Sequence, residues 1–148
     1  EIAEGLPCSV VIACADRAVA TLSQQAFNTT TFRVYTNDDV IGSEAAGALK
    51  NVMAIAAGMA HGLGFGDNTM AMLITRALAE LTRLGMAMGG RALTFAGLAG
   101  MGDLIVTAFS EHSRNHSLGR LLGSRAGDLS AGEIRDCKTT ASLLPLPE

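Results

Sequence analysis

The sequence contains no tryptophan, one tyrosine and five phenylalanines, so aromatic side chains make up only 4% of its 148 residues. Its hydrophobic content of 49% comes mainly from alanine, leucine, methionine, isoleucine and valine, accompanied by 17 glycines. Small side chains let helix backbones approach one another closely. The composition therefore favours closely packed helices, and the length suffices for one compact domain or for a domain that carries part of another.

Charged residues are also scarce, at 17%, and the formal net charge is −3. No basic surface points to a nucleic acid partner, and no acidic tract points to a disordered tail. The first ten residues lack the basic and continuously apolar regions of a secretory signal. We therefore expect a cytoplasmic protein with a small-molecule partner, either uncharged or an anion bound by a few residues.

The three cysteines, Cys8, Cys14 and Cys137, are odd in number and form no C-x-x-C pair. This pattern argues against both a disulfide framework and a zinc site. His112 and His116 have H-x-x-x-H spacing, but no third ligand lies near them in the sequence. We therefore expect no metal site.

The first 36 residues are typical of a strand–helix–strand unit. Ser9–Ala13 and Phe32–Tyr35 are short β-branched or alternating runs, and between them Asp16–Phe27 has helical spacing, with Asp16 placed to cap the helix. One such unit cannot cover both faces of a sheet. We therefore interpret it as the last piece of a larger parallel α/β domain.

After this unit the pattern changes to long helices, with a domain boundary near residues 37–42. One helix is predicted from Ser43, its candidate cap, to about Ala60, and the glycines of 62–67 end it. A second is predicted over Asn68–Met88 and should pack against the first. Its predicted apolar stripe comprises Ala71, Ile74, Ala77, Leu78, Leu81 and Leu84.

Two glycine clusters, at 62–66 and 97–102, do not fit the G-x-G-x-x-G pattern of a dinucleotide-binding turn after a strand. We predict turns at both. The helix predicted from Ser43 to Ala60 also contains Glu44 and Lys50, which make it a poor membrane span and a better core helix.

Lys50 lies in the middle of the small, apolar helix segment AAGALKNVMAIAAG. A lysine held among apolar side chains gives up its proton more readily, which suits it to exchange a proton with a substrate hydroxyl or carbonyl. The alternative is a lysine whose stem lies along the helix flank and whose ammonium reaches solvent. From this residue alone both interpretations stay open.

Three polar residues, Ser113, Arg114 and Asn115, precede the apolar part of a predicted helix, where backbone N–H groups point outward. A phosphate monoester would gain bidentate hydrogen bonds from the guanidinium there. The alternative is ordinary capping of the helix by Ser113 or Asn115, with Arg114 in solvent.

Asp103 follows the second glycine cluster and precedes the apolar run LIVTAF. Its carboxylate can accept a hydrogen bond from a substrate hydroxyl or orient the lysine, and capping of the following helix is the alternative. Thr107 lies four residues on, so a helix would place its hydroxyl on the same face.

Several motifs in this order resemble the NAD(P)-dependent glycerol-3-phosphate dehydrogenases, particularly those of bacteria. They are FRVYTNDDVIGSE, GALKNVMAIAAGM, GLGFGDNTMAMLITRALAELTRLG, TFAGLAGMGDL and SRN, within residues 1 to about 125. The resemblance implies a mainly α fold: a Rossmann-domain remnant over 1–36, followed over 37–148 by a helical substrate-binding domain like the C-terminal domain of 6-phosphogluconate dehydrogenase.

The same resemblance implies reversible reduction of dihydroxyacetone phosphate to sn-glycerol 3-phosphate for phospholipid synthesis, with NADH or NADPH as cofactor. Lys50 corresponds to the family's catalytic acid/base, and Asp103, Ser113, Arg114 and Asn115 to its substrate-binding residues. Thr107 is a weaker transfer. Arg114 is also expected to contact the cofactor, and a homodimer is compatible with the pattern.

The sequence also departs from the family pattern. The glycine-rich dinucleotide fingerprint is absent, so we expect the chain not to complete catalysis alone, and the tail after about residue 126 does not match. Two alternatives stay open: a non-catalytic helical remnant, and another hydroxy-acid dehydrogenase of the same helical superfamily. The sequence does not distinguish NAD from NADP.

Overall fold

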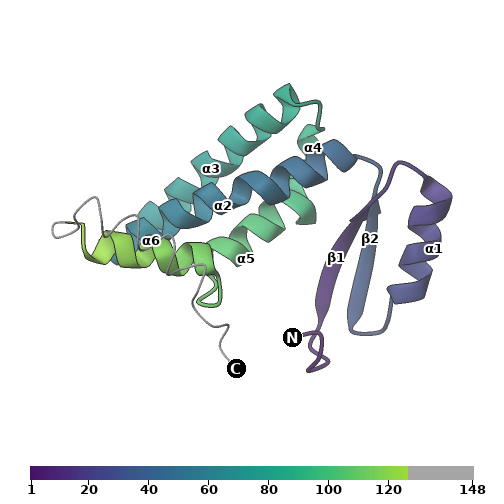
Figure 1. Cartoon of the computed structure of the whole chain (residues 1–148), viewed down its shortest axis with the longest axis horizontal. Coiled ribbons are helices and arrows are strands. Elements are labelled where there is room, and N and C mark those ends of the chain that lie inside the picture. The colour runs from purple at the N-terminus through teal and green to yellow at the C-terminus, as the bar shows by residue number, and fades with distance from the viewer. Residues whose placement is uncertain (127–148) are drawn as a thin grey trace. The chain divides into compact units, whose positions relative to one another are not determined.

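The computed structural model describes residues 1–126, which form two compact units whose elements are labelled in Figure 1. The first unit comprises Glu1–Ala48 and Leu81–Gly102, and the second comprises Leu49–Glu80 and, within the described residues, 103–126. Two long helices contribute to both units, α2 (Val40–Gly62) and α3 (Asp67–Ala87). The boundary predicted near residues 37–42 falls where α2 begins, whereas the compact units divide within the helices.

The predicted strand–helix–strand unit is confirmed. It consists of β1 (Cys8–Ala13), α1 (Arg17–Phe27) and β2 (Phe32–Asn37), and the two strands pair in parallel. The Asp16 carboxylate caps α1 as predicted, accepting the backbone N–H of Ala18 at 2.8 Å. Both strands extend one or two residues beyond their predicted ends.

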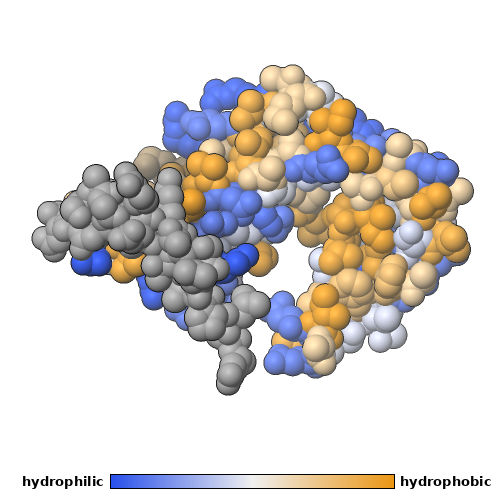
Figure 2. Space-filling model, in the orientation of Figure 1, coloured by the Kyte–Doolittle hydropathy of each residue, from blue (hydrophilic) through white to orange (hydrophobic). Residues whose placement is uncertain are grey.

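Helix α1 is tied to the sheet through β2. The side-chain amide of Gln24 donates to the Val34 carbonyl oxygen at 2.7 Å, and the Asn28 side chain accepts the Val34 N–H at 3.0 Å. Val34 is fully buried, yet large apolar side chains of this unit remain exposed, among them Val19, Leu22, Phe27 and Tyr35. Figure 2 shows such apolar side chains over the strands, as expected of a sheet with a single covering helix.

Helix α2 begins at Val40, so the prediction of Ser43 as its cap is wrong. Asp39 is the cap, because its Oδ1 accepts the backbone N–H of Gly42 at 2.9 Å. The helix ends at Gly62, and Gly64, with φ of 78°, turns the chain toward α3. None of the helices among the described residues combines the length and apolar character needed to cross a membrane.

A buried polar cluster in the first unit is centred on Asp39. Its Oδ2 accepts the backbone N–H of Arg91 at 2.8 Å and the Thr94 hydroxyl at 2.6 Å. The hydrogen bond from Thr94, followed by those from the two backbone N–H groups, holds the pKa of Asp39 below its usual value despite burial. The cluster fixes the start of α2 to α4 (Ala92–Ala96), a short helix that the sequence pattern did not predict.

The glycines of 97–102 do not all form turns, so this prediction is wrong. Leu98–Gly102 forms a π-helix that follows α4. Gly100 is required because a Cβ there would lie 2.4 Å from the Cα of the fully buried Phe95. Gly85 of α3 makes room for the ring of Phe95, since a Cβ on Gly85 would lie 1.8 Å from the Cζ of that ring. The glycines therefore allow close packing around Phe95.

The second unit is helical and adds α5 (Asp103–Phe109) and α6 (Arg114–Ser124) to parts of α2 and α3. Its core comprises Ala57, Ala60, Met70, Leu73, Ile74 and Ala108. These residues confirm that α2 and α3 pack together. The predicted stripe on α3 is wrong at its ends, because Ala71 and Leu84 are exposed.

Candidate functional site

Lys50 and Asp103 form a hydrogen-bonded ion pair between α2 and α5. The Lys50 side chain is 21% exposed and that of Asp103 is 39% exposed, so both are accessible from solvent without being free in it. The lysine is therefore neither unpaired nor extended into solvent. Of the roles considered for Asp103, the geometry matches orientation of the lysine.

The sequence of α2 explains why Lys50 is held in this position. Ala46 and Ala54 lie one helical turn before and after it, and both are buried. Lys50 therefore lies on a line of small buried residues, where a longer neighbour would compete for the same space. Its aliphatic stem is covered and its ammonium reaches the carboxylate of α5.

Thr107 lies one turn after Asp103 on α5, as predicted. Its hydroxyl donates to the backbone carbonyl oxygen of Asp103 at 2.6 Å, which is a bond within the helix. The hydroxyl proton is thus used locally. Thr107 therefore lies one helical turn after the aspartate, and its hydroxyl bonds to the helix backbone rather than to Lys50.

Ser113 and Arg114 begin α6. The Ser113 hydroxyl accepts the backbone N–H of His116 at 3.2 Å, which is the capping role considered as the alternative. Arg114 is the first residue of the helix and is exposed. Its guanidinium and the backbone N–H groups at the very start of the helix, before His116, can together bind an anion.

Asn115 connects the start of α6 to the residue next to the lysine. Its Nδ2 donates to Oδ1 of Asn51 at 2.9 Å. Asn51 was missed as a site residue, although the sequence carries a signal: it directly follows Lys50 and is the second polar residue in the apolar segment AAGALKNVMAIAAG. Two adjacent residues of α2 therefore have different partners: Lys50 pairs with Asp103 on α5, and Asn51 holds the start of α6.

Helices α2 and α6 are in backbone contact beyond this bond. Each carries a G-x-x-x-G motif, Gly58–Gly62 and Gly119–Gly123. A Cβ on Gly58 would lie 2.1 Å from the His116 carbonyl oxygen, and one turn later a Cβ on Gly62 would lie 2.2 Å from the Arg120 carbonyl oxygen. As residue numbers rise along α2, the numbers of the contacted residues on α6 rise as well. The two helices therefore run parallel, with their backbones in contact.

The second unit thus brings together an ion pair and the start of a helix with an exposed arginine. Such an arrangement can bind a small anion and exchange a proton with it. The described residues contain no group of three or more histidine, cysteine or acidic side chains that could hold a metal ion.

Comparison with known sequences identifies one family. The sequence model of the NAD-dependent glycerol-3-phosphate dehydrogenase C-terminus matches residues 39–142, which includes part of the tail after residue 126. A glycerol-3-phosphate dehydrogenase [NAD(P)+] of Moorella thermoacetica is 60% identical over 123 residues, covering 83% of this chain and 37% of that protein. One from a Geobacter species is 54% identical and covers 96% of this chain and 44% of that protein.

Solved structures show the same likeness. A glycerol-3-phosphate dehydrogenase from Coxiella burnetii matches 95% of this chain and 41% of its own, with a TM-score of 0.84 and 38% identity. A structure from Dunaliella salina covers 98% of this chain and 25% of its own, with a TM-score of 0.81 and 30% identity. The chain spans a little over a third of the length of the curated relatives it matches first.

Proposed function

Since this chain belongs to the NAD-dependent glycerol-3-phosphate dehydrogenase family, through the C-terminal domain of that family, we propose that it forms the substrate-handling part of such an enzyme. The family membership and the mainly α fold predicted from the motifs are confirmed. The proposed reaction interconverts dihydroxyacetone phosphate and sn-glycerol 3-phosphate, which supplies the backbone of phospholipids. The Lys50–Asp103 ion pair is the observation that carries the proposal.

Lys50 is the proposed acid/base residue. In reduction, its ammonium gives a proton to the C2 carbonyl oxygen of dihydroxyacetone phosphate as the carbonyl becomes a hydroxyl. In oxidation, the neutral amine accepts the proton of that hydroxyl. Asp103 keeps the nitrogen in one position and stabilises the ammonium, so the proton donor is oriented before the substrate arrives.

When bound, a nicotinamide cofactor, NAD or NADP, supplies or accepts the hydride at C2. The turn after β1 is not the glycine-rich loop that cradles a dinucleotide, so this chain does not by itself fit the whole cofactor. Arg114 is our one candidate contact in the chain, because its exposed guanidinium suits a phosphate.

The substrate's phosphate is proposed to bind at the start of α6. Ser113, Arg114 and Asn115 would hold it through the guanidinium, the polar side chains and the N–H groups of the first turn. Asn51 keeps Asn115 in place at 2.9 Å. Phosphate binding there and proton transfer at Lys50 are thus performed by neighbouring helices of one unit.

We further propose a cytoplasmic location and no nucleic acid partner, which the net charge of −3 supports. A homodimer is the assembly to test first, by sedimentation velocity. These proposals concern an enzyme of this family as a whole, and the family's C-terminal model matches residues 39–142 of this chain.

The test joins this chain to the N-terminal part of the Moorella thermoacetica relative, a hybrid called here the joined enzyme. It should oxidise NADH or NADPH only when dihydroxyacetone phosphate is present. Lys50→Ala should remove nearly all of this activity, because it removes the proposed proton donor.

Lys50→Arg is the matched control. It keeps a positive charge beside Asp103, but a guanidinium does not release its proton near neutral pH. It should therefore be as inactive as Lys50→Ala while preserving the ion pair. Substantial activity in Lys50→Arg would show that the lysine acts only through its charge and would contradict the proton-transfer role.

A further inference from the structure

His116 is a buried histidine that the proposed proton transfer does not use. It is only 3% exposed, and its Nε2 lies 3.4 Å from Nδ1 of His61 at the end of α2. The two ring centroids are 5.4 Å apart, with the planes tilted by 49°. One ring can therefore donate a hydrogen bond to the other across the contact between α2 and α6.

Neighbouring residues hold the backbone of His116 and one nitrogen of its ring. Its backbone N–H donates to the Ser113 hydroxyl, and its carbonyl oxygen lies against Gly58, where a Cβ would come within 2.1 Å. Its ring is held by His61. Because His116 directly follows Asn115, a movement of the ring or of its backbone displaces the residues that we assign to phosphate binding.

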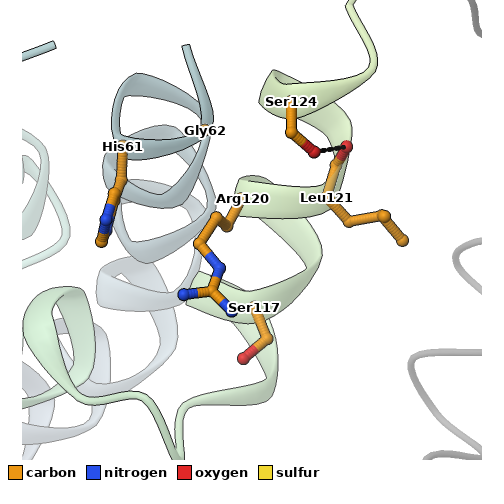
Figure 3. Close-up of a pocket in the computed structure, with 6 residues that line it drawn as sticks. All are labelled: His61, Gly62, Ser117, Arg120, Leu121 and Ser124. Carbon is orange, nitrogen blue, oxygen red and sulfur yellow. Dashed lines mark hydrogen bonds between the residues drawn. The ribbon is translucent and has the colours of Figure 1, made fainter. Parts of the chain in front are cut away.

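The charges around His116 favour its neutral form. Burial lowers its pKa most, and the neighbouring His61 and Arg120 lower it further, while Glu111 acts in the opposite direction. His61 on α2 and Arg120 on α6 line a pocket of about 440 Å³. Figure 3 shows the Arg120 guanidinium directed toward Ser117.

We propose that His116, anchored by His61, is a positioning residue for the phosphate-binding start of α6. The proposal rests on the proposed function, since it assigns the phosphate of the substrate to Ser113–Asn115. His116 does not touch the substrate in this scheme. It acts by keeping the first turn of α6 pressed against α2, so that Arg114 and Asn115 are already placed when the phosphate arrives.

Acid should release this anchor. When both rings carry a proton, neither nitrogen of the 3.4 Å contact can accept a hydrogen bond, and two positive charges face each other. Arg120 adds to the repulsion, and Glu111 is the acidic group that opposes it. The affinity for substrate should therefore fall in acid more steeply than titration of the substrate's own phosphate explains.

The experiment measures KM and kcat of the joined enzyme for dihydroxyacetone phosphate. His116→Leu should raise KM about tenfold, the equivalent of one lost hydrogen bond, with kcat changed less than about twofold. His116→Gln should restore most of the affinity, because its amide can still bond to His61 but does not titrate. The additional acid dependence of KM should disappear in His116→Gln.

His112→Gln is the matched control, because His112 lies in the loop before α6 and is exposed. It should leave KM and its pH dependence unchanged. His61→Leu is a second variant for the case that His116→Leu does not fold, since it removes the same bond from an exposed position. It should raise KM by a similar factor.

The outcomes separate the two proposals. If the unsubstituted joined enzyme has no activity, the proposed function fails and His116 has no reaction to support. If it is active but His116→Leu and His61→Leu leave KM unchanged, or His116→Gln keeps the additional acid dependence of KM, the positioning role is overturned. A loss confined to kcat would also overturn it, since positioning of the phosphate is read in KM.

Discussion

Each compact unit contains an aspartate that joins two helices, but the two aspartates differ in their exposure to solvent and in their partners. Asp39 in the first unit has a side chain only 5% exposed, whereas Asp103 in the second is 39% exposed. Asp39 accepts hydrogen bonds from two backbone N–H groups and the Thr94 hydroxyl. Asp103 pairs with Lys50, itself half-buried.

The difference separates a structural carboxylate from one available for chemistry. The partners of Asp39 belong to the elements that it joins, so its charge is used to hold the start of α2 against α4. The partner of Asp103 is an ammonium that can exchange protons, and solvent reaches both groups. We therefore expect Asp39 to matter for stability and Asp103 for turnover.

The largest effect should come from Asp103→Asn in the joined enzyme. The amide keeps the shape but cannot stabilise the ammonium or orient it as strongly, so kcat/KM should fall about 100-fold or more. The unfolding temperature should change little, because the carboxylate is partly exposed. Steady-state kinetics and thermal unfolding measure the two quantities.

Asp67→Asn is the control for this prediction, since Asp67 is an exposed acid at the start of α3. It should leave kcat/KM unchanged. A marked loss of stability in Asp103→Asn, with normal turnover in the protein that remains folded, would erase the distinction between the two carboxylates.

Asp39→Asn should have the next largest effect, on stability. It weakens the cap of α2 and the bonds to Arg91 and Thr94, so the free energy of unfolding should fall by about 2 kcal/mol, with kinetics per folded molecule preserved. Because the pKa of Asp39 is lowered in the folded state, its contribution is present above about pH 3.8 and is lost as pH falls through the folded value.

Urea unfolding from neutral to acid pH measures this contribution. The difference in stability between the unsubstituted enzyme and Asp39→Asn should be constant at neutral pH and should shrink below about pH 4. A difference that does not change with pH would mean that the ionised carboxylate is not what stabilises the unit.

A smaller effect is expected for Asn51→Ala, which leaves the Asn115 amide without its 2.9 Å partner on α2. KM for dihydroxyacetone phosphate should rise about fivefold, because one neutral hydrogen bond is lost next to the phosphate site. The control is Asn68→Ala, at an exposed position in the first turn of α3. An unchanged KM in Asn51→Ala would show that α6 is held by its backbone contacts alone.

Local patterns predicted much of this molecule. The strands around α1 and the cap at Asp16 follow from side-chain types within a few residues, and the structure has them at nearly the predicted positions. The motifs around Lys50 and Asp103 pointed to residues 53 positions apart that the structure pairs. Their roles in substrate handling stay a prediction.

Features that depend on distant residues were missed. Asp39 replaces Ser43 as a cap because Arg91 and Thr94, more than 50 residues away, bind the same carboxylate. Within the π-helix at Leu98–Gly102, Gly100 packs directly on the backbone of Phe95. In the sequence alone, Ser43 looks like a helix cap and the glycines of 97–102 look like turn glycines. Only the tertiary packing shows that Asp39 is the cap and that these glycines belong to a π-helix.

The smallest effect should come from Thr107→Val, which tests where the second unit's chemistry ends. The Thr107 hydroxyl donates to the backbone of Asp103 at 2.6 Å, and valine keeps the shape without this bond. If the hydroxyl serves only the helix, kcat/KM should change less than about threefold, since the carbonyl of Asp103 keeps its place in α5. Thr107→Ser, which retains the hydroxyl, is the matched control. A loss in Thr107→Val that approaches that of Asp103→Asn, restored by serine, would place the hydroxyl beside the reacting atoms and extend the site one turn along α5.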